Sequence, residues 1–134
     1  MKYLILISLI FSSISLKAQD EILGNFWTPD KDGKVEILKR GNKYYGKLTY
    51  ATHPGKDINN PDPKKRNLDV VGSEFIKDLV FDKKNSWIDG SIYDARSGKS
   101  YNCDVTLLEN GDLKVRGYVG FSLLGQSVTF YRIK

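Results

Sequence analysis

The residues that could carry out chemistry in this chain are few and scattered. Nucleophilic catalysis needs an activated Ser or Cys with a base within reach, and the sequence has one histidine, His53, and one cysteine, Cys103. His53 precedes Pro54 in a loop-like segment, which favours a solvated side chain, and no spacing links it to Cys103. The sequence therefore predicts neither an enzyme nor a bound cofactor.

One acidic segment has part of the spacing of a calcium loop. It reads Asp-Lys-Asp-Gly over residues 30–33, but Thr28 stands where the first carboxylate is needed and the terminal Glu is missing. A turn at the start of a hairpin explains these residues more simply. No glycine-rich loop precedes a helix, so no phosphate site is indicated either. We expect no metal site.

The remaining polar candidates are charged or phenolic residues: Asp62, Arg66, Tyr93, Asp94, Arg116 and Tyr118. Arg116 lies in the middle of an apolar run. If it points inward it needs a partner, because an unpaired buried charge costs about several kcal/mol, and Asp94 or Asp62 is the expected partner. Such a pair would pin a loop to the fold, or would anchor the head group of an acidic ligand. Catalysis by two carboxylates has no pair marked out by spacing.

Short β-strands are expected to position these residues. Apolar and polar residues alternate in short runs separated by turn residues, and no helical period exceeds two turns. The Asn110-Gly111 pair predicts a type I′ hairpin turn. The runs predict an all-β fold, a single antiparallel up-and-down β-barrel of about eight strands. The predicted strands cover 22–27, 35–37, 44–50, 79–81, 88–93, 101–108, 113–121 and 126–133.

The alternation also assigns side chains to faces. Tyr101, Cys103, Val105 and Leu107 share the apolar face of their strand, which predicts a buried, inert thiol. In the next strand Arg116 lies on the face opposite Val115. A barrel of this size holds either its own side chains or one small ligand, and both fillings remain open. The aromatic residues that could line a cavity, or fill a core, are Tyr44, Tyr50, Tyr93, Tyr101 and Phe121.

One long segment, 52–72, breaks the strand pattern. Its three prolines, Pro54, Pro61 and Pro63, argue against a central strand. A connection of this length is unusual in a small domain and is commonly a lid, a binding loop or simply a mobile segment.

The N-terminus is typical of a secretory signal peptide covering 1–18. Lys2 is followed by a short apolar run and then by Ala18 before a polar segment, and the run is too short to span a bilayer comfortably. Export is therefore predicted, to the periplasm or beyond. Residues 19–134 are predicted to form one domain with no membrane span. Their lysines are scattered rather than gathered on one stripe, which argues against nucleic-acid binding.

Three motifs in this order resemble the bacterial secreted family called domain of unknown function 2147. They cover 60–66 (Asn-Pro-Asp-Pro-Lys-Lys-Arg), 92–101 (Ile-Tyr-Asp, Gly-Lys and Tyr) and 115–125 (Val-Arg-Gly-Tyr-Val-Gly with Leu-Leu-Gly). The resemblance implies a calycin-like barrel, and the lipocalins of that group carry small apolar ligands. It also implies that Arg132 stacks over Phe26 or Trp27 to close one barrel end by a cation–π contact. Here Phe26 stands where the family usually has Trp.

Two functional hypotheses follow. The first is a non-enzymatic envelope protein that binds a small, partly apolar ligand in its barrel. The second is an interaction or structural module with a filled barrel, whose outer face or 52–72 loop docks an envelope protein. A cavity inside the barrel would favour the first hypothesis, and a filled interior with an exposed apolar patch would favour the second.

Overall fold

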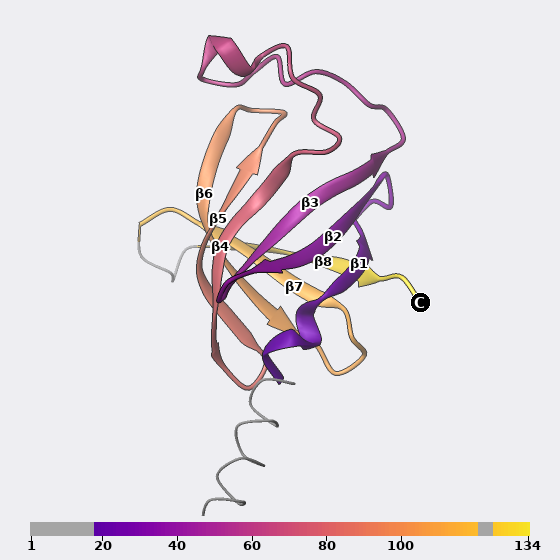
Figure 1. Ribbon diagram of the computed structural model, residues 1–134, viewed down its shortest axis with the longest axis vertical. Helices are drawn as coiled ribbons and strands as arrows, with labels where there is room; N and C mark the ends of the chain where they lie inside the picture. Colours follow the sequence, from indigo (N-terminus) through magenta and orange to yellow (C-terminus); the bar gives the residue numbers. More distant parts are fainter. Residues whose placement is uncertain (1–17, 121–124) are drawn as a thin grey trace, which may run out of the picture.

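Eight antiparallel strands close into a barrel in the computed structural model, which describes residues 18–120 and 125–134 (Figure 1). Each strand pairs with its neighbours in sequence, and β1 pairs with β8 to complete the ring. The predicted all-β fold, a single antiparallel up-and-down barrel of eight strands, is confirmed. The strands are β1 (Gly24–Trp27), β2 (Gly33–Arg40), β3 (Lys43–Ala51), β4 (Glu74–Lys83), β5 (Ser86–Asp94), β6 (Lys99–Leu107), β7 (Leu113–Tyr118) and β8 (Gln126–Arg132).

The largest error in the predicted strands concerns β4. The sequence predicted only 79–81, whereas the strand runs over Glu74–Lys83. Asp78 has a φ of 62°, and the β3–β4 pairing shifts register along the strand. Such irregularities break the two-residue period on which strand prediction depends. Two other predictions reach residues outside the described ranges: most of the signal peptide, and Phe121.

The hairpin between β6 and β7 is present, but its predicted turn type is wrong. The amide of Gly111 donates to the carbonyl of Leu108, and only Gly111 of the Asn-Gly pair has a positive φ, at 93°. A type I′ turn needs a positive φ at both residues. The Asn110 side chain instead accepts a hydrogen bond from the amide of Asp112 at 3.0 Å. That local contact stabilises the longer turn.

The core occupies the middle and one end of the barrel. Its members come from every strand and include Trp87, Tyr44 and Cys103, each with no exposed area. The predicted inward position of Cys103 is confirmed, and burial raises the pKa of its thiol to about 12. A thiol that stays protonated is a poor nucleophile.

A short 3₁₀ helix, η1 (Asp20–Ile22), closes one end of the barrel. The sequence had assigned Ile22 to the first strand, but β1 begins at Gly24. Ile22 is fully buried among the core residues. Asp20 accepts hydrogen bonds from Lys39 at 3.0 Å and from the Tyr44 hydroxyl at 2.8 Å. The segment therefore acts as a plug held by one apolar and one polar contact.

Arg132 crosses the same closed end. Its guanidinium lies 4.6 Å from the centre of the Phe26 ring and donates to the carbonyls of Leu23, Glu21 and Gly111 at 2.8–2.9 Å. Gly24 leaves room for it, because a Cβ there would lie 2.7 Å from the guanidinium. Of the two aromatic residues considered from the sequence, Phe26 lies under Arg132. Trp27 instead contacts Lys34, 4.8 Å from its ring centre.

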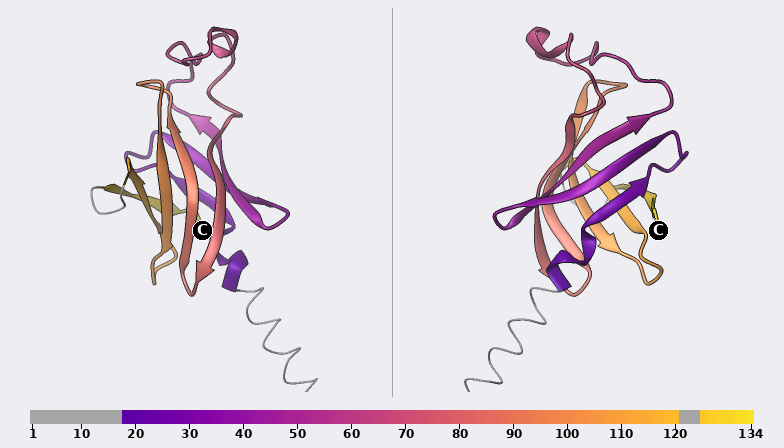
Figure 2. Two further views of the ribbon diagram at one scale, coloured as in Figure 1. Left: turned by 90° about the vertical axis from the view of Figure 1, so that its left-hand side faces the viewer. Right: turned by 45° about the vertical axis from the view of Figure 1, so that its right-hand side comes forward.

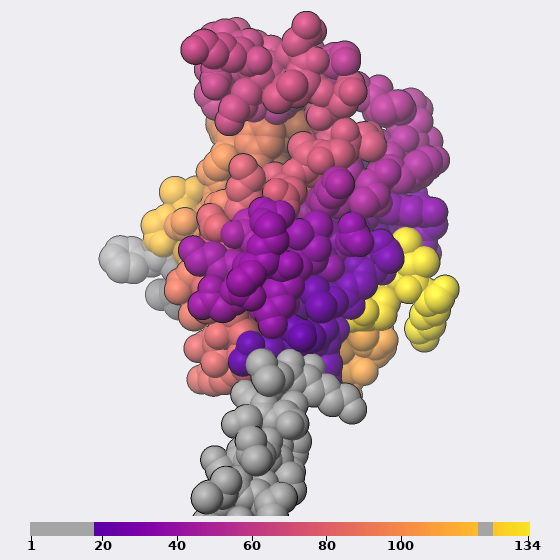
Figure 3. Space-filling view, in the orientation of Figure 1, coloured from indigo at the N-terminus to yellow at the C-terminus, as the bar shows by residue number. Residues whose placement is uncertain are grey.

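The opposite end of the barrel carries the long connection between β3 and β4. It contains a second 3₁₀ helix, η2 (Pro63–Lys65), and an isolated bridge between Lys56 and Asp69. It stands beyond the strand ends in both side views (Figure 2) and covers the top of the barrel in the space-filling view (Figure 3). Gly98 in the β5–β6 turn lies so close to Asn59 that a Cβ would clash with its carbonyl. The loop therefore rests on this turn.

Within the described parts of the chain, none of the helices is long and apolar enough to cross a membrane.

Candidate ligand-binding site

A cavity of about 410 Å³ opens at the barrel end that carries the long loop. Its lower walls are apolar side chains of the strands, with Phe75 and Phe130 at a ring-centre distance of 6.4 Å. Val128 lines the cavity and is 45% exposed although it points to the barrel interior. An interior position that remains accessible shows that the side chains do not fill this end. Leu48 and Ile92 also line the cavity from the strands.

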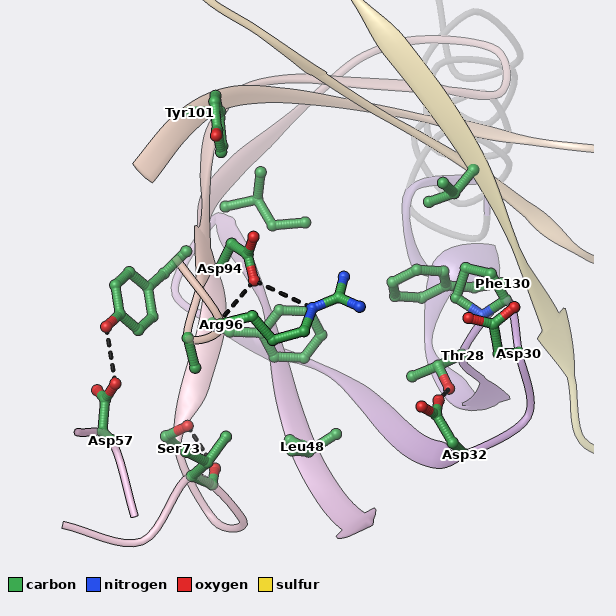
Figure 4. A pocket seen from close by; sticks show the side chains of 17 residues that line it. Thr28, Asp30, Asp32, Leu48, Asp57, Ser73, Asp94, Arg96, Tyr101 and Phe130 are labelled. Carbon is green, nitrogen blue, oxygen red and sulfur yellow. Dashed lines mark hydrogen bonds and ion pairs between the residues drawn. The ribbon is translucent and has the colours of Figure 1, made fainter. Parts of the chain in front are cut away.

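The mouth of the cavity is polar and comes from three connections. The β1–β2 turn supplies Thr28, Asp30 and Asp32, the long loop supplies Asp57, and the end of β5 supplies Asp94 (Figure 4). These polar side chains are far apart in the sequence. They line one opening because the segments that carry them lie at the same end of the barrel.

Hydrogen bonds orient several of these groups. The Tyr93 hydroxyl donates to Asp57 at 2.7 Å, and the Thr28 hydroxyl donates to Asp32 at 2.8 Å. Desolvation, followed by the hydrogen bond to Asp57, raises the pKa of Tyr93 to about 12. Tyr93 therefore remains a neutral donor throughout the physiological pH range and ties the long loop to β5.

Asp94 shapes the β5–β6 turn as well as the mouth. Its carboxylate accepts from the backbone amide of Arg96 at 3.0 Å and from the Ser97 hydroxyl at 3.1 Å. The Arg96 guanidinium lies 3.5 Å from the same carboxylate, but its side chain is 91% exposed. Such an exposed pair contributes little to stability, and Arg96 is free to reorient.

The expected partner of Arg116 is wrong. Arg116 lies on the outer face of β7, directly across from Asp104 on β6, and their side chains approach to 3.5 Å. Neither Asp94 nor Asp62 is the partner. The alternation that buries Val115 forces its neighbour outward. Burial outweighs the attraction of Arg116 and raises the pKa of Asp104.

Of the other polar residues predicted from the sequence to bind a ligand, two line the cavity and three do not. Tyr118 lies beside Arg116 on the outer face, with the guanidinium 5.0 Å from its ring centre. Asp62 caps η2 by accepting from the Lys64 amide at 3.0 Å, and Arg66 donates to the Asn60 carbonyl at 2.7 Å. These two shape the long loop and do not line the cavity. Tyr93 and Asp94 do line it.

The expected aromatic lining also divides. Tyr101 and Tyr93 line the cavity, whereas Tyr44 lies at the closed end against Asp20. Tyr50 is 45% exposed on the outside, with Lys34 5.5 Å from its ring centre. Phe121 lies outside the described residues.

Sequence reasoning missed Asp30, Asp32, Asp57 and Arg96 as mouth residues. Asp30 and Asp32 were assigned to a turn, which is correct, but only the closure of the barrel brings that turn to the mouth. Inward strand alternation could have found Val128 and Phe130. No spacing rule relates Asp57 to Asp94. In the described residues, no group of three or more His, Cys, Asp or Glu side chains is placed to hold a metal ion.

Comparison with known proteins agrees with the motif resemblance. A family model described as "Uncharacterized protein conserved in bacteria (DUF2147)" matches residues 24–132. Among solved structures, protein HP1028 from the human pathogen Helicobacter pylori, described as belonging to the lipocalin family, superposes with a TM-score of 0.79. It is 28% identical, and the match covers 84% of this chain and 83% of that one. No curated protein matches the chain significantly.

Proposed function

Because the chain belongs to the DUF2147 family of uncharacterized bacterial proteins, and its barrel is lipocalin-like, we propose that it is an exported protein that binds a small, partly apolar ligand. The cavity of about 410 Å³ at the open end carries this proposal. Its volume falls within the range of about 300–1,000 Å³ that is typical of small-molecule sites. The ligand's apolar part contacts the lower walls, and its polar part faces the mouth.

The two ends of the barrel differ in a way that supports this function. One end is plugged by Ile22 and crossed by Arg132. The other end has apolar walls, among which Val128 is 45% exposed, and a polar mouth. The alternative hypothesis, an interaction module, requires a filled barrel, and the cavity argues against it.

Export is part of the proposal. Among the residues that the structure describes, the contacts of Asp20 with Lys39 and Tyr44 hold η1 to the barrel. Cleavage after Ala18 would leave these contacts in the mature protein. The apolar run and Lys2 that precede this site are the features of a signal peptide.

We expect Val128→Trp to abolish binding of a small apolar probe, because the indole would occupy the cavity. The probe is N-phenyl-1-naphthylamine, an uncharged fluorophore whose emission rises when it leaves water. Fluorescence titration of the purified protein should give saturable binding, and the variant should lose it while it stays folded. Because Val128 is 45% exposed at the cavity, the unfolding free energy should change by no more than about 1–3 kcal/mol, the typical cost of an enlarged side chain.

The matched control is Thr129→Trp. Thr129 is the next residue along β8 and lies on the opposite face of the strand. This variant should bind the probe like the wild type. Equal binding by wild type and Val128→Trp would place the ligand elsewhere, and absence of binding by the wild type would contradict the proposal.

A further inference from the structure

The charge of the cavity mouth is opposite to the charge of the chain. The chain carries a formal net charge of +5 at pH 7. The cavity lining contains four aspartates, Asp30, Asp32, Asp57 and Asp94, and one basic residue, Arg96. A basic protein thus presents an acidic opening to its cavity.

Neutral groups make most of the contacts of these carboxylates. Asp57 accepts from the Tyr93 hydroxyl and from the Asn60 side-chain amide, both at 2.7 Å. Asp32 accepts from the Thr28 hydroxyl. These hydrogen bonds orient the carboxylates without cancelling their charge. Of these four aspartates only Asp94 has a cation of the described residues within ion-pair distance, and that cation is the exposed Arg96.

The carboxylates surround the opening rather than sharing one point. Figure 4 shows Asp57, Asp94 and the Asp30–Asp32 turn on different sides, with Arg96 extending between them. Below them lie apolar walls, including Ile92, Phe130 and Val128. A ligand that fills the cavity therefore has its buried part among apolar side chains and its outer part among carboxylates.

This arrangement discriminates between ligand classes by charge. A carboxylate head group would meet four like charges and a single mobile arginine. A neutral hydroxyl head group could donate one hydrogen bond to a carboxylate but would gain no attraction between opposite charges. A protonated amine would be attracted by the four aspartates and would donate hydrogen bonds to the carboxylate lone pairs that the neutral donors leave free. Electrostatic complementarity of this kind sets specificity.

We propose that the ligand is a cationic amphiphile, a small molecule with an apolar body and a protonated amine head group. This inference rests on the proposed function, because it names the ligand class of the same cavity. The apolar body lies against Phe75, Ile92 and Phe130, and the ammonium lies at the mouth near Asp32, Asp57 and Asp94.

Three probes with one alkyl chain and different head groups test the proposal: n-octylammonium, n-octanol and n-octanoate. Competition against N-phenyl-1-naphthylamine at pH 7 and low ionic strength measures their relative affinities. The ammonium should bind most tightly and the carboxylate most weakly, and added salt should narrow the difference because it screens the charges at the mouth.

Single charge removals then locate the effect. Asp94→Asn and Asp32→Asn keep a hydrogen-bond acceptor for the turn, and each should weaken n-octylammonium by about two- to fivefold without affecting n-octanol. Arg96→Gln should act in the opposite direction and strengthen n-octylammonium. The matched control is Asp82→Asn, which removes an exposed carboxylate from β4 outside the cavity lining and should change neither probe.

The outcomes separate the two proposals. Equal or tighter binding of n-octanol or n-octanoate would overturn the cationic ligand while leaving a small-molecule carrier in place. Failure of all three alkyl probes and of the fluorophore would overturn both. An effect of Asp82→Asn equal to that of Asp94→Asn would show that net charge, not the mouth, attracts the amine, and would overturn the cationic site.

Discussion

At the scale of single residues, Arg132 shows how one side chain organises a barrel end. Desolvation lowers the pKa of the Arg132 guanidinium. The negative charges of Asp112 and Glu21 act in the opposite direction and partly offset this lowering. Three backbone carbonyls and the Phe26 ring compensate for this burial. Phe26 occupies the position at which the family usually has Trp, and the stacking geometry is kept because it needs only an aromatic face.

We expect Arg132→Lys to lower the free energy of unfolding by about 2–4 kcal/mol. An ammonium cannot replace a planar fork that donates to Leu23, Glu21 and Gly111 together, so two part-buried carbonyls and one exposed carbonyl compete for fewer donors. Urea denaturation measures the change. The exposed Arg96→Gln should shift stability by less than about 0.5 kcal/mol; a similar loss in both variants would refute the special role of Arg132.

At the scale of elements, η1 combines a local helix turn with two long-range anchors. Hydrogen bonds from Lys39 and then from Tyr44 lower the pKa of Asp20, and the hydrogen bond to Asp20 raises the pKa of Lys39. The lowered pKa of Asp20 and the raised pKa of Lys39 both favour the charged form of the group, which indicates that the ionised pair is the state that holds η1 in place. Ile22 supplies the apolar contact.

This linkage predicts a pH dependence of stability. The pKa of Asp20 is lower in the folded chain than its ordinary value of 3.8, so its contribution is complete above that value and is lost as pH falls through the folded pKa. Unfolding free energies between about pH 5 and 2 should fall less steeply for Asp20→Asn than for wild type. Because Asp20 is partly exposed, the difference should be modest, at or below about 1 kcal/mol. Parallel curves for Asp20→Asn and the wild type would contradict the linkage.

At the scale of the whole molecule, closure of the barrel gives the two ends separate roles. β1 and β8, the first and last strands, meet through Phe26 opposite Arg132 and Trp27 opposite Tyr131. The closed end lies where the described chain begins, at the barrel end opposite the long loop (Figure 1). Asp57 and Val70 of the long loop line the cavity, so the cavity lies at the other end.

We expect export to yield a mature chain that begins at Gln19. Expression of the full sequence in a bacterial host, followed by fractionation and intact-mass spectrometry of the periplasmic protein, should give 116 of the 134 residues. Ala18→Phe, which puts a bulky residue before the cleavage site, should leave an uncleaved product. A full-length mass confined to the cytoplasm would refute the signal peptide.

The sequence by itself determined the fold class and the faces of the strands. Alternation is a local property, so it placed Cys103 and Val105 inside and predicted eight strands that close in order. Strand prediction was wrong in β4, where the irregular backbone at Asp78 breaks the two-residue period. The predicted turn type was wrong at Asn110, whose side chain accepts a hydrogen bond from the Asp112 amide and so stabilises a different turn.

The candidate site was decided by the tertiary structure. Asp30, Asp57 and Asp94 are far apart in sequence and meet because ring closure brings three connections to one end. The partner of Arg116 was likewise set by cross-strand register, which places Asp104 opposite it. Register and closure depend on the packing of all eight strands at once, and no local pattern in the chain encodes the distances that result.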